Sequence, residues 1–178
     1  MNYRPATELD VNAIAKLHAL SWQNAYRGML SDWYLSQEVY PERLNVWETR
    51  LKQSKPHQFV VVAEDEQEIV GFACAFGSTE KRWGALLDNL HIHPAARRKG
   101  IGKALMQQVA MWIIDNYDSH QMHLFVFAAN KGACLFYERL GGKENETKEM
   151  AMPDGELVPS IKYVWERVDS MMVDPRIK

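Results

Sequence analysis

The chain has 178 residues, which predicts a single domain with a core of its own. Hydrophobic residues make up 47% of it and charged residues 25%, and a formal net charge of −2 excludes an overall electrostatic attraction to nucleic acid or to an anionic membrane. The N-terminus has no signal-peptide pattern, no apolar run is long enough to span a bilayer, and Cys74 and Cys134 lie in apolar runs. We therefore expect a cytoplasmic protein with two reduced, buried thiols.

The first third of the chain is predicted to be mainly helical. Thr7 to Asp10 has the Ser/Thr-x-x-acid form that begins helices, and Gly28 interrupts the apolar spacing that follows. Ser31 can cap a second helix, and Pro41 is suited to the first turn of a third. The expected elements are a strand over residues 3–6 and helices over residues 7–26, 31–35 and 41–53.

From residue 58 onward, β-branched and aromatic runs alternate with helical patterns. The expected elements are strands over residues 59–63 and 69–76 joined by a loop of several residues, a strand over 86–92, a helix over 101–117, a strand over 122–127, a helix over 131–140, and strands over 147–152 and 158–165. Joining the 86–92 and 122–127 strands in parallel through the long helix makes a right-handed βαβ unit. We expect residues 1–168 to form one α/β (α+β) domain, followed by a polar tail over 169–178.

A phosphate-binding turn is predicted between the 86–92 strand and the helix that follows it. Pro94 ends the strand, and Gly100 and Gly102 open the helix beside Arg97, Arg98, Lys99 and Lys103. Glycines allow a diphosphate to approach the backbone, and the free N–H groups of a helix N-terminus bind phosphate oxygens. A basic turn that only caps a surface helix is the structural alternative.

Two common phosphate loops do not match this turn. A P-loop needs glycine at Arg97 and Ser or Thr at Ala104, and a dinucleotide-binding loop needs a third glycine at Leu105. What matches is Arg-x-x-Gly-x-Gly, from Arg97 to Gly102, after a strand that ends in His-Pro. This segment resembles motif A of the GNAT N-acetyltransferase superfamily, whose members bind the pyrophosphate of acetyl-CoA there.

A second segment, Asn130 to Gly141, resembles the next motif of the same superfamily. The resemblance implies that Asn130 contacts the cofactor and that Tyr137, seven residues on, protonates the departing thiolate. Read structurally, Asn130 is a helix N-cap and Tyr137 a core aromatic. The full set of cofactor-binding residues that the resemblance implies is Leu90, His91, Ile92, Arg97, Arg98, Lys99, Gly100, Ile101, Gly102, Lys103, Asn130 and Tyr137.

The general base is the point at which this chain departs from the family pattern. Some members carry a catalytic glutamate five residues before the motif asparagine, where this chain has Phe125. Asp88 and His91 are the candidates, with a water relay as a third. His91 is expected to have a pKa near neutrality, and kcat/KM would then rise through about pH 6 to 7. Strand alternation puts the two side chains on opposite faces, so at most one should point into any given pocket.

The segment from Ser21 to Leu30 resembles the acceptor-site wall of a bacterial subgroup of these acetyltransferases. Trp22 and Tyr26 are four residues apart and share a helix face, either as part of that wall or as core aromatics. An aromatic wall can bind a cationic amine, and the Asp88 carboxylate can attract one. Trp22, Tyr26 and Asp88 are therefore the candidate acceptor-binding residues.

The sequence thus predicts a mixed, mostly antiparallel sheet, with helices on both faces, that splays at its one parallel pair to admit acetyl-CoA. An acceptor amine, from a small molecule or a peptide, would attack the thioester directly in a ternary complex, with Tyr137 as acid and no metal. A coenzyme A-binding regulatory domain without catalysis is the second hypothesis. No nucleic-acid or membrane partner is expected, and the acceptor's identity and a homodimer stay open.

Overall fold

The computed structural model describes residues 1–53, 55–80 and 82–172. Seven strands form one sheet in the order β1-β2-β3-β4-β5-β7-β6. Every neighbouring pair is antiparallel except β4 and β5. The strands are β1 (Asn2–Pro5), β2 (Gln58–Asp65), β3 (Glu68–Glu80), β4 (Gly84–Ile92), β5 (Met122–Phe127), β6 (Lys143–Ala151) and β7 (Leu157–Trp165). The predicted fold class is confirmed.

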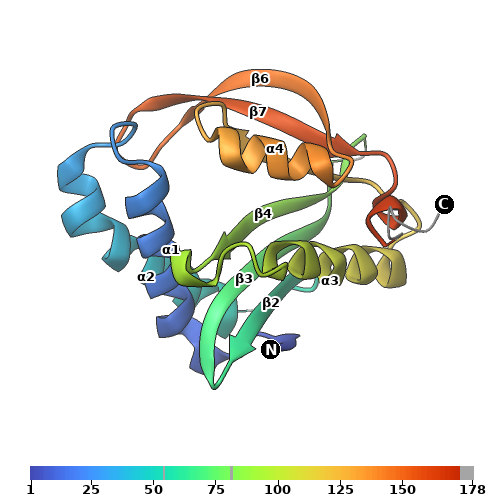
Figure 1. Cartoon of the computed structure of the whole chain (residues 1–178), viewed down its shortest axis with the longest axis horizontal. Coiled ribbons are helices and arrows are strands. Elements are labelled where there is room, and N and C mark those ends of the chain that lie inside the picture. Colours follow the sequence, from blue (N-terminus) through green and yellow to red (C-terminus); the bar gives the residue numbers. More distant parts are fainter. Residues whose placement is uncertain (54, 81, 173–178) are drawn as a thin grey trace.

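Helices cover both faces of this sheet (Figure 1). They are α1 (Val11–Ala25), α2 (Val39–Lys52), α3 (Ile101–Asn116) and α4 (Lys131–Arg139). In β2, Val60 and Val62 pack against α1 and α2, whereas Val61 and Ala63 belong to the core under α3 and α4. Successive side chains of a strand point to opposite faces, and helices cover both faces of β2. Its buried residues therefore form one continuous apolar run in the sequence.

Two local predictions in the first half are wrong. Residues 31–35 and 41–53 do not form separate helices, because a π-helical segment (η2, Tyr34–Glu38) leads directly into α2. The loop expected over residues 64–68 is a tight turn, because β2 reaches Asp65 and β3 starts at Glu68. Glu66 and Gln67 make that turn with φ of 48° and 72°, as a two-residue hairpin loop requires.

The end of the described chain packs against the domain. A short 3-10 helix (η4, Val168–Met171) follows β7, and Val168 and Met171 are buried in the core that includes α3. Residues 169–171 of the expected tail therefore lie against the domain, while residues 173–178 lie outside the described part. Cys74 and Cys134 are buried free thiols, as predicted.

The parallel pair separates soon after it begins. β4 and β5 are paired at Ala85 with Met122 and at Leu86 with His123, and the described strands show no pair beyond these. β4 nevertheless continues to Ile92 and β5 to Phe127. The splayed parallel pair is confirmed, and it leaves one edge of β4 without a strand partner from Leu87 onward.

Candidate active site

A β-bulge in β4 determines which side chains point toward α1 and α2. Cys74 of β3 lies opposite Asn89 and Ala75 lies opposite Leu87, so Asp88 is an extra residue with no partner in β3. On the face toward α2, Arg50 contacts both Asp88 and Asn89. The bulge therefore puts Asp88 on the same face as Asn89.

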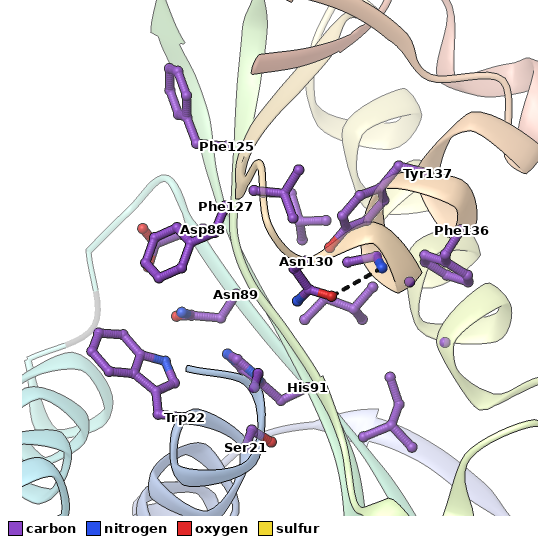
Figure 2. Close-up of a pocket in the computed structure, with 18 of the residues that line it drawn as sticks. Ser21, Trp22, Asp88, Asn89, His91, Phe125, Phe127, Asn130, Phe136 and Tyr137 are labelled. Carbon is purple, nitrogen blue, oxygen red and sulfur yellow. Dashed lines mark hydrogen bonds between the residues drawn. The ribbon is translucent and has the colours of Figure 1, made fainter. Parts of the chain in front are cut away.

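His91 points to that face too. Its ring centroid lies 5.2 Å from that of Phe72 and 4.5 Å from that of His18 on α1. The prediction that Asp88 and His91 point to opposite faces is wrong, because the extra residue of the bulge resets the alternation between them. Figure 2 shows Asp88, Asn89 and His91 with Trp22 on one side of β4, and Asn130, Phe136 and Tyr137 on the other.

A cavity of about 1230 Å³ runs through the gap between β4 and β5. It is lined by α1 and α2 at one end, by β4 and β5 in the middle, and by residues 96–103 and α4 at the other. The cavity includes all the predicted acceptor-wall residues and, apart from Lys99, all the predicted cofactor-binding residues. The structure thus brings together side chains that are more than 100 residues apart in the sequence.

The turn before α3 presents free backbone donors. Gly100 caps the helix with a φ of +81°, and Arg98 also has a positive φ of 63°. The first amide with an intrahelical acceptor is that of Ala104, which donates to the Gly100 carbonyl at 3.1 Å. Within the described chain, the N–H groups from Arg98 to Lys103 have no backbone acceptor. These donors and the exposed cations beside them fit a diphosphate.

Gly102 serves a different purpose from Gly100. A Cβ on Gly102 would lie 3.2 Å from Phe136 Cζ and 3.4 Å from Ile92 Cδ1, so a side chain there would press on α4 and β4. A Cβ on Gly100 would meet nothing within 4 Å, so its positive φ is the reason for glycine at that position. One glycine permits the turn, and the other permits the close packing of α3.

The two structural roles considered for the second motif, a helix N-cap at Asn130 and a core aromatic at Tyr137, are both present. Asn130 Oδ1 accepts a hydrogen bond from the Ala133 N–H at 3.2 Å and so caps α4. Tyr137 is buried among apolar residues, and this burial raises the pKa of its phenol. Its hydroxyl points from α4 toward β4 (Figure 2). A phenol that stays protonated at neutral pH is suited to donate a proton.

The opposite end of the cavity is aromatic and contains two arginines. The Trp22 ring lies 5.3 Å from the Tyr26 ring, which confirms that the two share a face. Arg43 stacks on Trp22 with its guanidinium carbon 4.6 Å from the ring centroid. Arg50 forms an ion pair of 2.7 Å with Asp88. The Asp88 charge is therefore partly neutralised before any acceptor arrives.

Sequence reasoning missed Arg43 and Arg50. The signal was available, because positions 43, 47 and 50 recur at helical spacing and share one face of α2. Trp47 on that face is fully buried, which indicates that its arginine neighbours also point inward. Long charged side chains on a helix are usually exposed. For this reason, arginines that point inward are easily overlooked when only the sequence is considered.

His91 does not have the expected pKa near neutrality. Burial, with smaller contributions from the charges of Arg43 and Arg97, lowers its pKa to about 3. The ring is therefore neutral at pH 7 and a poor acceptor for a proton from an amine. The pH 6 to 7 limb of kcat/KM that a His91 base would produce is not expected from this environment.

This environment predicts how stability depends on pH. Because the pKa of His91 is lower in the folded than in the unfolded chain, the unfolded chain binds the extra proton between about pH 6.5 and 3, and stability falls as pH drops through that range. His91→Gln removes this linkage, so between pH 7 and 5 its free energy of unfolding should fall by about 1 to 2 kcal/mol less than that of the wild type. Urea unfolding at the two pH values measures the difference.

His57→Gln is the matched control, because His57 is exposed and lies outside the cavity lining. It should follow the wild type at both pH values. Equal losses in the wild type and His91→Gln would contradict a His91 that is neutral in the folded chain.

Comparison with known proteins identifies the family. The chain matches the model of the acetyltransferase (GNAT) family over residues 17–142, which is more than half of its length. The chain belongs to the GNAT family. It is 29% identical over 139 residues to the uncharacterized N-acetyltransferase YuaI of Bacillus subtilis (strain 168), with 76% of each chain covered. The predicted family is therefore confirmed.

Solved structures of other acetyltransferases share the fold. PaiA N-acetyltransferase from Thermoplasma acidophilum, solved in complex with coenzyme A, superposes with a TM-score of 0.65 at 20% identity, covering 91% of this chain and 98% of that one. YncA, a putative acetyltransferase from Salmonella typhimurium solved with acetyl-CoA, gives a TM-score of 0.65 at 19% identity over 95% and 94% of the two chains. The GNAT fold of this chain thus occurs in proteins that bind coenzyme A or its acetyl thioester.

Two features are absent from the described residues. None of their helices has both the length and the apolar character needed to cross a membrane. In the same part of the chain, no three His, Cys, Asp or Glu side chains are grouped so that they could hold a metal ion.

Proposed function

We propose that this GNAT protein transfers the acetyl group of acetyl-CoA to the nitrogen of a primary amine, by direct attack in a ternary complex. The observation that carries the proposal is the cavity through the splayed β4–β5 pair, which connects a phosphate-binding turn with an aromatic acceptor wall. A cofactor and an acceptor that enter from opposite ends would meet beside the unpaired edge of β4. Such an arrangement favours reaction between two bound substrates.

Acetyl-CoA would supply an activated acyl group and a thiolate leaving group. The turn from Arg97 to Lys103 holds its diphosphate, and the main-chain groups of Leu90, His91 and Ile92 bind the pantetheine arm. Backbone N–H groups on the same edge stabilise the negative charge that develops on the thioester oxygen. Asn130 orients the start of α4 toward the cofactor, and Tyr137 donates a proton to the sulfur.

Asp88 is the residue proposed to act on the amine. Among the described residues that line the cavity, it supplies the one carboxylate. It would accept a hydrogen bond from the ammonium form of the acceptor and pass the proton to water, while its ion pair with Arg50 holds the carboxylate in place. Trp22 and Tyr26 would form the wall against which the acceptor rests.

The function is tested by thiol release from acetyl-CoA in the presence of a panel of amines, with the N-acetylated product identified by mass spectrometry. Amine-dependent release is expected. Tight binding of acetyl-CoA without release for any amine would instead support the coenzyme A-binding regulatory domain.

Asp88→Asn should reduce kcat for an accepted amine by about 10²-fold, because the amide cannot take up a proton. The fold should be kept, since the amide oxygen can still accept a hydrogen bond from Arg50. Calorimetry should show an unchanged affinity for coenzyme A. Asp115→Asn, which alters an exposed position on α3, is the control for charge and should behave as the wild type. Near-normal kcat in Asp88→Asn would exclude this role for Asp88.

A further inference from the structure

Three buried polar atoms lie at the acceptor end of the cavity without a partner. In the part of the chain that the structure describes, His18 Nε2, Ser21 Oγ and Arg43 Nε have no hydrogen bond. His18 and Ser21 are one helical turn apart on α1, and Arg43 stacks on Trp22 next to Ser21 in the chain. We call His18, Ser21 and Arg43 the donor cluster. An unpaired buried polar group costs about 1–3 kcal/mol, so three together indicate a missing partner.

All three atoms can donate hydrogen bonds. His18 Nδ1 accepts from the indole N–H of Trp47 at 3.0 Å, and an indole nitrogen only donates. Burial lowers the pKa of His18 well below its usual value, so the ring is neutral and carries its proton on Nε2. The Arg43 Nε–H only donates, and the Ser21 hydroxyl can donate. The missing partner is therefore a hydrogen-bond acceptor.

The carboxylates nearby are already occupied. Glu42 accepts hydrogen bonds from another nitrogen of Arg43 and from the Tyr34 hydroxyl. Asp88 is paired with Arg50. The acceptor end of the cavity thus presents two arginines against one lining carboxylate. Glu42 behind Arg43 balances the charge, so a purely cationic acceptor, such as a polyamine, would find only Asp88, already paired with Arg50, to hold its ammonium groups.

Two of the three side chains of the donor cluster line the cavity. Ser21 and Arg43 line it directly, and His18 lies behind His91, with 4.5 Å between the two ring centroids. The Arg43 side chain is only 11% exposed, so its charge is poorly screened by water. Figure 2 shows Ser21, Trp22 and His91 close together on the Asp88 side of β4. A small oxyanion bound there would lie on the same side of β4 as Asp88.

We propose that the donor cluster binds the carboxylate of the acceptor, and that the acceptor is an amino acid or a similar small molecule with both an amine and a carboxylate. This inference rests on the proposed acetyltransferase function. The carboxylate would accept from Arg43 and Ser21, the two members of the cluster that line the cavity, with His18 behind them. The amine would then lie toward Asp88 and the unpaired edge of β4. Charge-assisted hydrogen bonds of this kind are among the stronger ones in proteins.

The test compares acceptors in matched triples, each made of an amino acid, its carboxamide and its decarboxylated amine; tryptophan, histidine and lysine provide three such triples. Thiol release from acetyl-CoA gives kcat and KM for each member. The carboxamide has the more acidic ammonium group, so a preference for the acid cannot arise from easier loss of the amine proton. We expect kcat/KM for the acid to exceed that of both other members by about 10-fold or more.

Two variants assign the preference to the donor cluster. Arg43→Gln should raise KM for the acid by about 10- to 100-fold, with kcat and the affinity for coenzyme A little changed. Ser21→Ala should raise the same KM less, and its melting temperature should not fall, because the hydroxyl has no partner to lose. Lys52→Gln removes a charge from an exposed position of the same helix and should match the wild type.

The possible outcomes distinguish a failure of carboxylate recognition from a failure of the proposed acetyltransferase function. Acetylation of amines without preference for the acid, or an equal rise of KM for all three members in Arg43→Gln, would overturn carboxylate recognition and leave the acetyltransferase intact. An unchanged acid KM in Ser21→Ala, with Arg43→Gln unfolded, would also count against the cluster. Thiol release from no member of any triple would overturn the proposed function, and this inference with it.

Discussion

Tyr137→Phe is expected to lower kcat for acetyl transfer by about 10²-fold or more while cofactor affinity stays unchanged. The substitution removes only the phenolic proton, and loss of a general acid typically costs this much. The ring of Tyr137 packs against Tyr163 and Trp165, and phenylalanine keeps that packing. Steady-state thiol release measures the first quantity, and calorimetry with coenzyme A measures the second.

Tyr163→Phe is the matched control for that experiment. Tyr163 belongs to the same buried cluster, but its hydroxyl donates to Glu138 at 2.8 Å and does not line the cavity. Its loss should reduce stability slightly and leave kcat near the wild-type value. If Tyr137→Phe retained normal turnover, Tyr137 would be a packing residue, and the proton for the thiolate would come from elsewhere.

Gly100→Asp is expected to weaken coenzyme A binding by about 10²-fold or more. The position caps α3 with a φ of +81°, beside the free N–H groups that would hold the diphosphate. An aspartate there adds negative charge next to the bound phosphates and can itself occupy the N–H groups as a helix cap. Calorimetric titration with coenzyme A measures the loss.

Gly100→Ala separates charge from strain. A Cβ at this position meets no neighbour within 4 Å, so alanine introduces only the cost of a positive φ, about 1–2 kcal/mol. The aspartate variant should lose no more stability than the alanine variant, because its side chain can cap α3, while the alanine variant binds coenzyme A much better. Equal affinities in the two variants would argue that the diphosphate binds away from this turn.

The sequence predicted the proposed cofactor half of the site more fully than the proposed acceptor half. The phosphate-binding turn depends on glycines, cations and a strand-ending proline that are close together in the chain, from Arg97 to Lys103. Asn130 and Tyr137 are likewise fixed by one short helix. In both segments the local pattern is enough to place the groups, because backbone conformation and helical spacing act over a few residues.

The acceptor half depends on contacts that local patterns do not encode. The Asp88–Arg50 ion pair and the neutral His91 arise because α1 and α2 pack on β4, which begins more than 30 residues after the end of α2. The bulge at Asp88 shows the same limit, since strand alternation alone predicts the wrong face for one of two candidate bases.

By itself, the sequence determined the fold class, most helices and strands and the family, and it predicted the turn proposed to bind the diphosphate, because periodicity, glycines and capping residues act locally. Only the tertiary structure decided the charge and hydrogen-bonding character of the acceptor site. In the sequence, Arg43 resembles any charged residue of a surface helix. In the folded chain, it is largely buried against Trp22. The energy of a charge or of an unpaired donor depends on the dielectric and on the partners around it, and these exist only once distant segments have packed together.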